Sequence, residues 1–365
     1  MSKETEFPTY PPLFFVRITE NLRNFFLRMN RRFTHPNMVL WEMTHGLWLA
    51  AGISVAAELG LADLLKEKPR TTDELAELTG MHKESLYRIM RMLASHGIFR
   101  EQRGKKFSST PLAKPLQEDQ IRHLILTHVN PRHFQMFGEI MTTVKTGKNV
   151  SGVTSGTALF ERIGNDVKKN ARFNKAMTNA SRMQASTILS AYSFNRYRNI
   201  IDVGGGQGLF LAAILDHSKE CKGIVFDLPS ALMQAGEVIE NYSLEGRMKA
   251  EGGDFFEKVP EGGDLYMMKS VLHDWNDDDS IKILRNVRNA MDPGSRLLII
   301  ESVIEKGNKP SFGKMTDILM MVAAGGKERT RAEYEALLEQ TGFRIRKIQP
   351  TISPHSLIET EKVEQ

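Results

Sequence analysis

A single glycine-rich turn constrains the fold of this chain more than any other segment. The hydrophobic run 199–203 leads into the sequence GGGQG at 204–208, and an apolar, helix-like stretch at 209–215 follows at once. This order predicts a strand, a tight turn and the start of a helix, where bare backbone lets a cofactor lie against the chain. A second predicted strand, 222–226, ends at Asp227, an acid placed to accept hydrogen bonds from ribose hydroxyls. The turn and the acid together predict an adenosyl-containing cofactor, and on their own they fit NAD, FAD and S-adenosylmethionine alike.

The C-terminal half predicts an open, mostly parallel sheet, because strand-like and helix-like stretches alternate there. Seven strands are expected, at 199–203, 222–226, 247–250, 264–269, 296–302, 343–349 and 355–361. The third strand is followed by Asp254 and Phe255, an acid and a ring suited to an adenine base. Ligands of such sheets collect at the carboxyl ends of the strands, so we expect Gly204, Asp227 and Asp254 to meet in one crevice.

The N-terminal half predicts helices. Residues 37–66 have apolar positions at helical spacing, and Thr71 and Glu74 are spaced as a capping box that opens a short helix. A second helix at 83–95 and two small strands near 97–100 and 106–108 complete the order of a winged helix. We therefore divide the chain into an N-terminal segment, a winged-helix domain, a helical connecting region over the substrate and a cofactor-binding catalytic domain, at residues 1–36, 37–115, 116–197 and 198–365.

Residues 13–33 form a separate feature, in which aromatic and aliphatic residues recur between five arginines and a single acid, Glu20. The pattern is that of a basic amphipathic helix, and two interpretations fit it. The helix can lie on a membrane surface. Alternatively, its apolar face packs on a partner subunit or on its own domain, which is the interpretation we favour because terminal segments of two-domain enzymes often dock in this way.

Composition excludes several classes of protein. At 365 residues, with 41% hydrophobic and 25% charged residues, the chain fits a soluble globular protein of two domains. The net charge of +5 does not by itself require nucleic acid, and no apolar run is long enough to span a membrane. The single cysteine, Cys221, excludes a disulfide framework and suits the reducing cytoplasm, and the N-terminus lacks the form of a signal peptide.

Five motifs in order resemble the S-adenosylmethionine-dependent O-methyltransferases of the caffeate, flavonoid and acetylserotonin type. They are DVGGGQG at 202–208, FDLP at 226–229, GGDFF at 252–256, LHDW at 272–275 and GGKERT at 325–330. The resemblance covers nearly the whole chain. It implies a Rossmann-like class I methyltransferase sheet, an N-terminal winged-helix domain that forms a homodimer, S-adenosylmethionine as the cofactor and a small hydroxylated, aromatic acceptor. The sequence departs from the plant pattern in its arginine-rich first 35 residues and at 321–324, ahead of GGKERT.

The same resemblance implies a role for particular residues. His273 is similar to the general base of the family, and Glu301 and Glu328 to the two acids that flank it. The expected cofactor contacts are Gly204, Gly206, Asp227, Asp254, Phe255 and Lys269, with Lys269 reaching the carboxylate of the cofactor. Asn174 and Met177 match a segment on which the acceptor ring rests in the family.

Elementary chemistry supports a histidine base. A phenol with a pKa near 10 is mostly protonated at neutral pH, and removal of its proton during attack accelerates a reaction by roughly 10²–10⁴-fold. A carboxylate on the far ring nitrogen fixes the tautomer of the imidazole, a role for Glu301 or Glu328. We expect no metal ion, because N-capping and dipole compensation of the helix at 281–290 account for the acidic cluster that precedes it, Asp274, Asp277, Asp278 and Asp279.

Two alternative functions share these features. A relative that keeps the fold and the cofactor can hydroxylate or decarboxylate instead of methylating, although such relatives tend to lose the basic histidine. A winged helix can also serve a DNA-binding regulator that senses the cofactor. Residues 71–110 carry seven basic against five acidic residues, however, which is not the clear basic face that phosphate binding requires. Nucleic acid is therefore the less favoured partner.

Overall fold

The computed structural model describes residues 11–150 and 167–363, and the chain divides into two compact units. The smaller unit comprises residues 14–135 and 175–180, and the larger one comprises the described residues within 136–174 and 181–363. Within the described ranges, no helix is both long and apolar enough to cross a membrane.

The smaller unit is mostly helical. Its helices, the last of which continues into the larger unit, are α1 (Leu13–Phe33), α2 (Pro36–Thr44), α3 (Gly46–Glu58), α4 (Leu61–Leu64), α5 (Thr72–Thr79), α6 (Lys83–Ser95), η2 (Lys114–Leu116), α7 (Arg122–His128) and α8 (Pro131–Gly138). The strands β1 (Arg70–Thr71), β2 (Phe99–Gln102) and β3 (Lys106–Ser109) form an antiparallel sheet in the order β1-β3-β2. Both halves of the predicted Thr71–Glu74 capping box are formed at the start of α5.

Residues 37–66 are mostly helical, as predicted. The segment forms three helices, with breaks at His45 and at Gly60. Gly60 has a φ of 62°, a left-handed conformation that glycine adopts readily and that interrupts a right-handed helix. The two predicted small strands are present, and β1 is an additional strand that sequence reasoning missed because it has only two residues.

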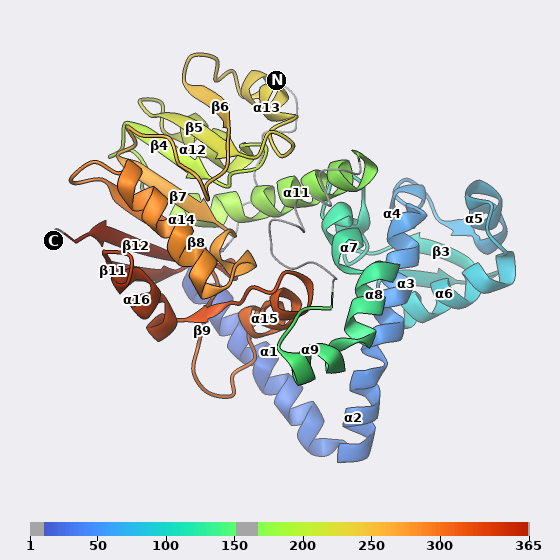
Figure 1. Ribbon diagram of the computed structural model, residues 1–365. Coiled ribbons are helices and arrows are strands. Elements are labelled where there is room, and N and C mark those ends of the chain that lie inside the picture. Colours follow the sequence, from blue (N-terminus) through green and yellow to red (C-terminus); the bar gives the residue numbers. More distant parts are fainter. Residues whose placement is uncertain (1–10, 151–166, 364–365) are drawn as a thin grey trace. The chain divides into compact units, whose positions relative to one another are not determined.

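The larger unit is built on a seven-stranded sheet, as predicted (Figure 1). Its strands follow the order β11-β12-β8-β7-β4-β5-β6, with β12 antiparallel to both neighbours and the rest parallel. The strand bounds are β4 (Asn199–Val203), β5 (Lys222–Asp227), β6 (Met248–Gly252), β7 (Leu265–Lys269), β8 (Arg296–Glu301), β11 (Phe343–Pro350) and β12 (Ser356–Lys362). Each lies within two residues of its predicted position.

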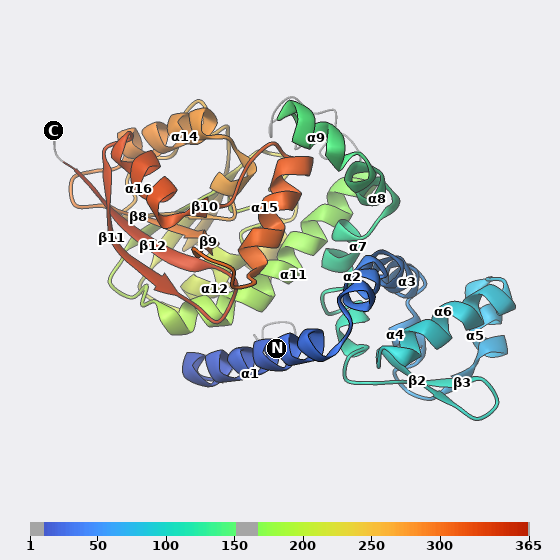
Figure 2. The same ribbon diagram turned by 90° about the horizontal axis from the view of Figure 1, so that it is seen from below.

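Helices cover both faces of this sheet (Figures 1 and 2). One face packs against α12 and α13 through a core that includes Phe210 and Leu211, and the other packs against α14 and α16 through a core that includes Ile283 and Leu337. The helices and short segments of this unit are α9 (Ile140–Thr146), α11 (Val167–Ala191), α12 (Leu209–His217), α13 (Ala235–Asn241), η3 (Leu272–Asp274), α14 (Asp277–Ala290), β9 (Val303–Ile304), α15 (Phe312–Ala323), β10 (Arg329–Thr330) and α16 (Arg331–Glu339). Burial on both faces explains why the central strands are continuous hydrophobic runs.

Candidate active site

The glycine turn and Asp227 meet at the carboxyl ends of β4 and β5, as the sequence predicts. The backbone N–H of Gly206 donates to Oδ2 of Asp227 at 2.8 Å, and Oδ1 accepts from the N–H of Leu228 at 2.7 Å. Burial raises the pKa of the Asp227 carboxyl, and these two backbone hydrogen bonds oppose the rise. The carboxylate therefore supports the turn from one side.

The turn excludes side chains where it touches the rest of the unit. Gly204 has a φ of +71°, and a Cβ there would lie 2.7 Å from Cγ2 of Val271. A Cβ on Gly206, by contrast, would meet no atom within 4 Å. The turn therefore packs tightly on one side and presents open backbone on the other, which is the arrangement that a cofactor lying against it requires.

Asp254 and Phe255 follow β6 at the same edge of the sheet. The ring of Phe255 lies 3.7 Å from the Cβ position of Gly204 and packs edge-on against Trp275, so it belongs to the same cluster as the turn. Oδ1 of Asp254 accepts a hydrogen bond from the N–H of Phe256 at 2.8 Å. The carboxylate thus stabilises a local turn, and its contact with a cofactor stays a prediction.

Asp202 was not predicted as a site residue, and its carboxylate is buried beneath the turn, against Gly205. Among the described residues, neither of its oxygens has a hydrogen-bond partner. Burial raises the pKa of Asp202 to about 7, although the charge of Lys269 opposes the rise. Burial also lowers the pKa of Lys269, against the attraction of Asp202 and Glu301. The sequence signal for Asp202 was its place near the end of β4, two residues before the first glycine of the turn.

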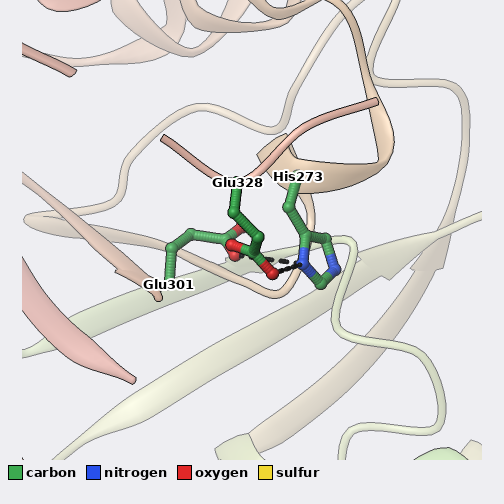
Figure 3. Close-up of side chains that lie close together, drawn as sticks. All are labelled: His273, Glu301 and Glu328. Atoms are coloured by element: carbon green, nitrogen blue, oxygen red, sulfur yellow. Dashed lines mark hydrogen bonds and ion pairs between the residues drawn. The ribbon is translucent and has the colours of Figure 1, made fainter. Parts of the chain in front are cut away.

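His273, Glu301 and Glu328 come together at the carboxyl end of β7, as predicted (Figure 3). Nδ1 of His273 lies 2.9 Å from Oε1 of Glu328 and 3.6 Å from Oε2 of Glu301. The histidine side chain is 16% exposed, whereas the two carboxylates are buried. The imidazole therefore presents one nitrogen to the two acids and has some access to solvent.

Three elements place these side chains. His273 lies in the short turn η3 after β7, and Glu301 ends β8, the neighbouring strand. Oε1 of Glu301 accepts from the N–H groups of Val271 and Leu272 at 2.8 and 2.9 Å, which holds the start of the turn. Glu328 arrives from a distant part of the sequence because β10 pairs in parallel with β9, directly after β8.

The two acids therefore make different contacts with the site. Glu328 hydrogen-bonds the ring, and Glu301 mainly holds the backbone of the turn. The sequence left open which acid faces the ring, since it contains no sign of the short β9–β10 pair.

The charges around His273 favour its protonated form. Burial lowers the pKa of His273, but Glu301, Asp274 and Glu328 together raise it to about 10. Burial raises the pKa of Glu301 to about 7, although the positive charge of His273 lowers it. A proton that reaches the imidazole is consequently well stabilised in this site.

Asp274 corrects one interpretation of the acidic cluster. The helix α14 begins at Asp277, earlier than predicted, and Asn276 is its N-cap, with Oδ1 accepting from the N–H of Asp279 at 2.9 Å. Asp274 neither caps this helix nor belongs to its first turn. Its Oδ1 instead lies 3.8 Å from Nε2 of His273, and burial raises its pKa to about 6. It is a site residue that sequence reasoning missed.

Asn174 and Met177, the predicted acceptor contacts, both lie on α11. Asn174 is buried and Met177 is half-buried. Their part in binding an acceptor stays a prediction.

The residues present fit an adenosyl cofactor with an amino-acid tail. The fit rests on the open backbone at Gly206, the supporting carboxylate of Asp227 and the unpaired buried carboxylate of Asp202. The ligand atoms of His273, Glu301 and Glu328 lie within 4.8 Å of one another, close enough for a shared cation. The hydrogen bond and the ion pair of His273 with the two glutamates explain this spacing without a cation. That the enzyme needs no metal ion stays a prediction.

Comparison with known proteins decides the family. Residues 137–344 match the O-methyltransferase domain, and residues 41–119 match the O-methyltransferase dimerisation domain. The chain belongs to the O-methyltransferase family. The predicted resemblance is thereby confirmed, as are methyl transfer and dependence on S-adenosylmethionine at the level of the family.

The similarity extends over most of the chain. Phenazine O-methyltransferase of Lysobacter antibioticus is 35% identical over 328 residues, which are 89% of this chain and 96% of that protein. The mitomycin biosynthesis 6-O-methyltransferase of Streptomyces lavendulae is 36% identical over 85% of this chain and 89% of its own length. The solved structure of LaPhzM matches with a TM-score of 0.85 at 34% identity, covering 90% of this chain and 100% of that one. These comparisons support neither the non-methylating nor the DNA-binding alternative.

Proposed function

We propose that this O-methyltransferase moves the methyl group of S-adenosylmethionine to a hydroxyl of a small aromatic metabolite, with His273 as the general base. The observation that carries the proposal is the 2.9 Å contact between His273 and Glu328. His273 lies two residues after Val271, whose side chain packs against Gly204 of the glycine turn. This places a basic nitrogen next to the cofactor crevice. The names of two relatives, a phenazine and a mitomycin O-methyltransferase, support an aromatic acceptor.

The chain's own residues bind the cofactor in this proposal. Gly204 and Gly206 give it bare backbone, and Asp227 accepts from its ribose hydroxyls. Asp254 accepts from the adenine, Phe255 packs on the base, and Lys269 reaches the carboxylate. When bound, S-adenosylmethionine supplies an electrophilic methyl group on sulfur. Holding the acceptor oxygen in line with that methyl group supplies much of the acceleration.

The proton of the acceptor hydroxyl goes to Nε2 of His273. Nδ1 faces Glu328 and donates to its carboxylate, which leaves Nε2 as the free acceptor. Glu328 fixes this tautomer and stabilises the imidazolium that forms. Glu301 adds its charge and holds the turn, and Asn174 and Met177 support the acceptor ring.

The domain assignment belongs to the same proposal. Residues 37–115 serve as a winged-helix dimerisation domain, 116–197 as a helical region over the acceptor, and 198–365 as the catalytic domain. The match of residues 41–119 to the dimerisation domain supports a homodimer. A cytoplasmic location agrees with the single cysteine, Cys221, which is free and buried.

The helices α1 and α2 extend the homodimer interface in this proposal. Neither helix has a buried residue in the single chain. Phe14, Phe26 and Phe33 are 68%, 66% and 80% exposed, and the exposed apolar face continues through Trp41 into α3 at Trp48. Soluble proteins rarely leave so large an apolar patch in water. Because Trp41 and Trp48, which lie in the matched dimerisation domain, are exposed as well, a second copy of this chain is the partner that fits these residues.

Calorimetric binding of S-adenosylmethionine and S-adenosylhomocysteine tests the proposed site. Wild type and His273→Ala should bind both compounds with micromolar affinity, whereas Asp227→Ala should not. Methylation of a panel of monohydroxy aromatic compounds, including a hydroxyphenazine, should then occur with wild type and fall by roughly 10²–10⁴-fold with His273→Ala. A wild type that binds neither compound would overturn the proposal.

A further inference from the structure

Arg329 is the largest fully buried side chain of the described residues, and the proposed mechanism does not use it. It directly follows Glu328 in the strand β10. An arginine is almost never fully buried unless its charge and all of its donors are satisfied. The contacts of its guanidinium group therefore indicate what the residue does.

The guanidinium group binds both ends of the turn that carries His273. Nη1 donates to the carbonyl oxygen of Leu272 at 2.8 Å, and Nη2 donates to that of Trp275 at 3.0 Å. These two residues enclose His273 and Asp274. Within the turn, the carbonyl oxygen of Leu272 accepts only a long hydrogen bond, 3.3 Å, from the N–H of Trp275. The fork of Arg329 adds a shorter one to the same oxygen and so ties the turn at both ends.

The same group fixes the turn to α14. Nε and Nη2 donate to Oδ1 of Asp277 at 3.0 and 2.9 Å, and Nη2 also donates to Oγ of Ser280 at 3.0 Å. Asp277 balances the charge. A lysine in this place would keep the charge but could not hold all of these acceptors at once, because only the planar guanidinium presents donors in a rigid fork.

We infer that Arg329 is a positioning residue for the proposed methyl transfer: it holds the His273 turn at the distance at which Glu328 can hydrogen-bond the imidazole. Glu328 immediately precedes β10 and Arg329 begins it, so neighbouring residues place the acid beside the ring and the guanidinium group against the backbone of the turn. Arg329 touches neither Glu301 nor the glycine turn in any described contact. Its loss should therefore affect the reaction and leave the cofactor in place.

The inference rests on the proposed function, and Arg329→Lys tests it in the full-length enzyme. With S-adenosylmethionine and the panel compound that reacts fastest, we expect kcat to fall at least tenfold while the Kd for S-adenosylhomocysteine stays within twofold of wild type. The matched control is Arg247→Lys. Arg247 also donates to several carbonyls, among them Leu215 and Lys219, but at the opposite edge of the sheet. This control should lower thermal stability without lowering kcat.

A second background separates positioning from general stability. In His273→Ala, whose residual rate does not use the imidazole, Arg329→Lys should change kcat less than twofold. An equal loss in both backgrounds, or an unchanged kcat in the wild-type background, overturns the inference. A wild type that binds no S-adenosylmethionine would instead overturn the proposed function.

Ser280→Ala replaces Arg329→Lys if that variant does not fold. It removes one acceptor of the guanidinium group and leaves the charge in place. We expect a loss of kcat of about threefold that again depends on the presence of His273. A Ser280→Ala enzyme with wild-type kcat overturns the inference.

Discussion

At the scale of single residues, the carboxylates around His273 set the pH at which it can act as a base. Only the neutral imidazole accepts a proton, and Glu301, Asp274 and Glu328 raise the pKa of His273 to about 10. Burial, together with the neighbouring Lys269 and His273, lowers the pKa of His355, so His355 adds no positive charge at neutral pH. We therefore expect kcat/KM to rise with pH and to level off near pH 10. In Glu328→Gln the rising limb should move to lower pH, because one of the stabilising charges is gone. A pH–rate profile of both enzymes measures this.

The comparison of the two enzymes also separates the base from the acceptor. A phenol ionises with a pKa near 10 in solution, so the limb of the wild type alone could belong to either group. Glu328→Gln cannot change the pKa of the free acceptor. An identical limb in the two profiles would therefore contradict the assignment of this pKa to His273.

Asp227 gives a second prediction at this scale. Asp227→Asn keeps the size of the side chain but removes the negative charge of the carboxylate, which accepts from Gly206 and, in the proposed function, from the ribose hydroxyls. The Kd for S-adenosylmethionine should rise by about tenfold or more, as measured by calorimetry. Asp264→Asn is the control, because Asp264 accepts from the backbone of Arg198 and Asn199 at the amino ends of the strands. If both variants bind equally well, Asp227 does not hold the cofactor.

At the scale of elements, the segment before β10 must lie flat against the His273 turn. A Cβ on Gly326 would collide with the carbonyl oxygen of His273 and with the backbone of Asp274. Gly326→Ala should therefore push β10 and Glu328 away from the ring and lower kcat at least tenfold, since small displacements of catalytic groups cost large factors. Gly236→Ala, in α13 with no atom within 4 Å of its Cβ position and no left-handed backbone, is the control for a glycine-to-alanine change as such. Equal kcat in the Gly326→Ala enzyme and wild type would refute this packing argument.

The elements also show how far the sequence predicts the site. The central strands β4, β5, β7 and β8 were predictable because each is a hydrophobic run bounded by turns. The glycine turn, Asp227, His273 and the two glutamates follow from strand ends and motifs. The roles of Asp202, Asp274 and Arg329 were not predictable. The positions of Asp274 and Arg329 depend on the turn η3 and on the two-residue pair β9–β10, which are too short to leave a periodic pattern. Asp202 lies in the predicted strand β4, but nothing in the sequence shows that its carboxylate is buried without a partner.

At the scale of the whole molecule, the smaller unit exposes many large apolar side chains, and most of them lie on α1, α2 and α3. The residues Leu22, Phe25 and Phe26 of α1 are more than half exposed, whereas the five arginines of the helix lie mainly on its other side. Most of the stability of a helix in a protein comes from the packing of its apolar face, and the apolar face of α1 packs on no core of the single chain. Its apolar face must therefore be covered, by a second copy of this chain or by a lipid surface, and the two possibilities predict different behaviour in solution.

Paired substitutions on α1 distinguish the two. Leu22→Glu with Phe26→Glu places two charges on the apolar face, and Asn21→Glu with Asn30→Glu adds the same charge to the polar side of the same helix. If a second copy covers the face, light scattering at several concentrations should give a dimer for wild type and for the asparagine pair, and a dimer Kd at least tenfold higher for the first pair. Vesicles of phosphatidylcholine and phosphatidylserine serve as the competing surface. The opposite result would be that wild type binds these vesicles and that the first pair loses this binding but still forms the dimer. It would mean that α1 is a membrane anchor and that the dimer interface does not extend to α1.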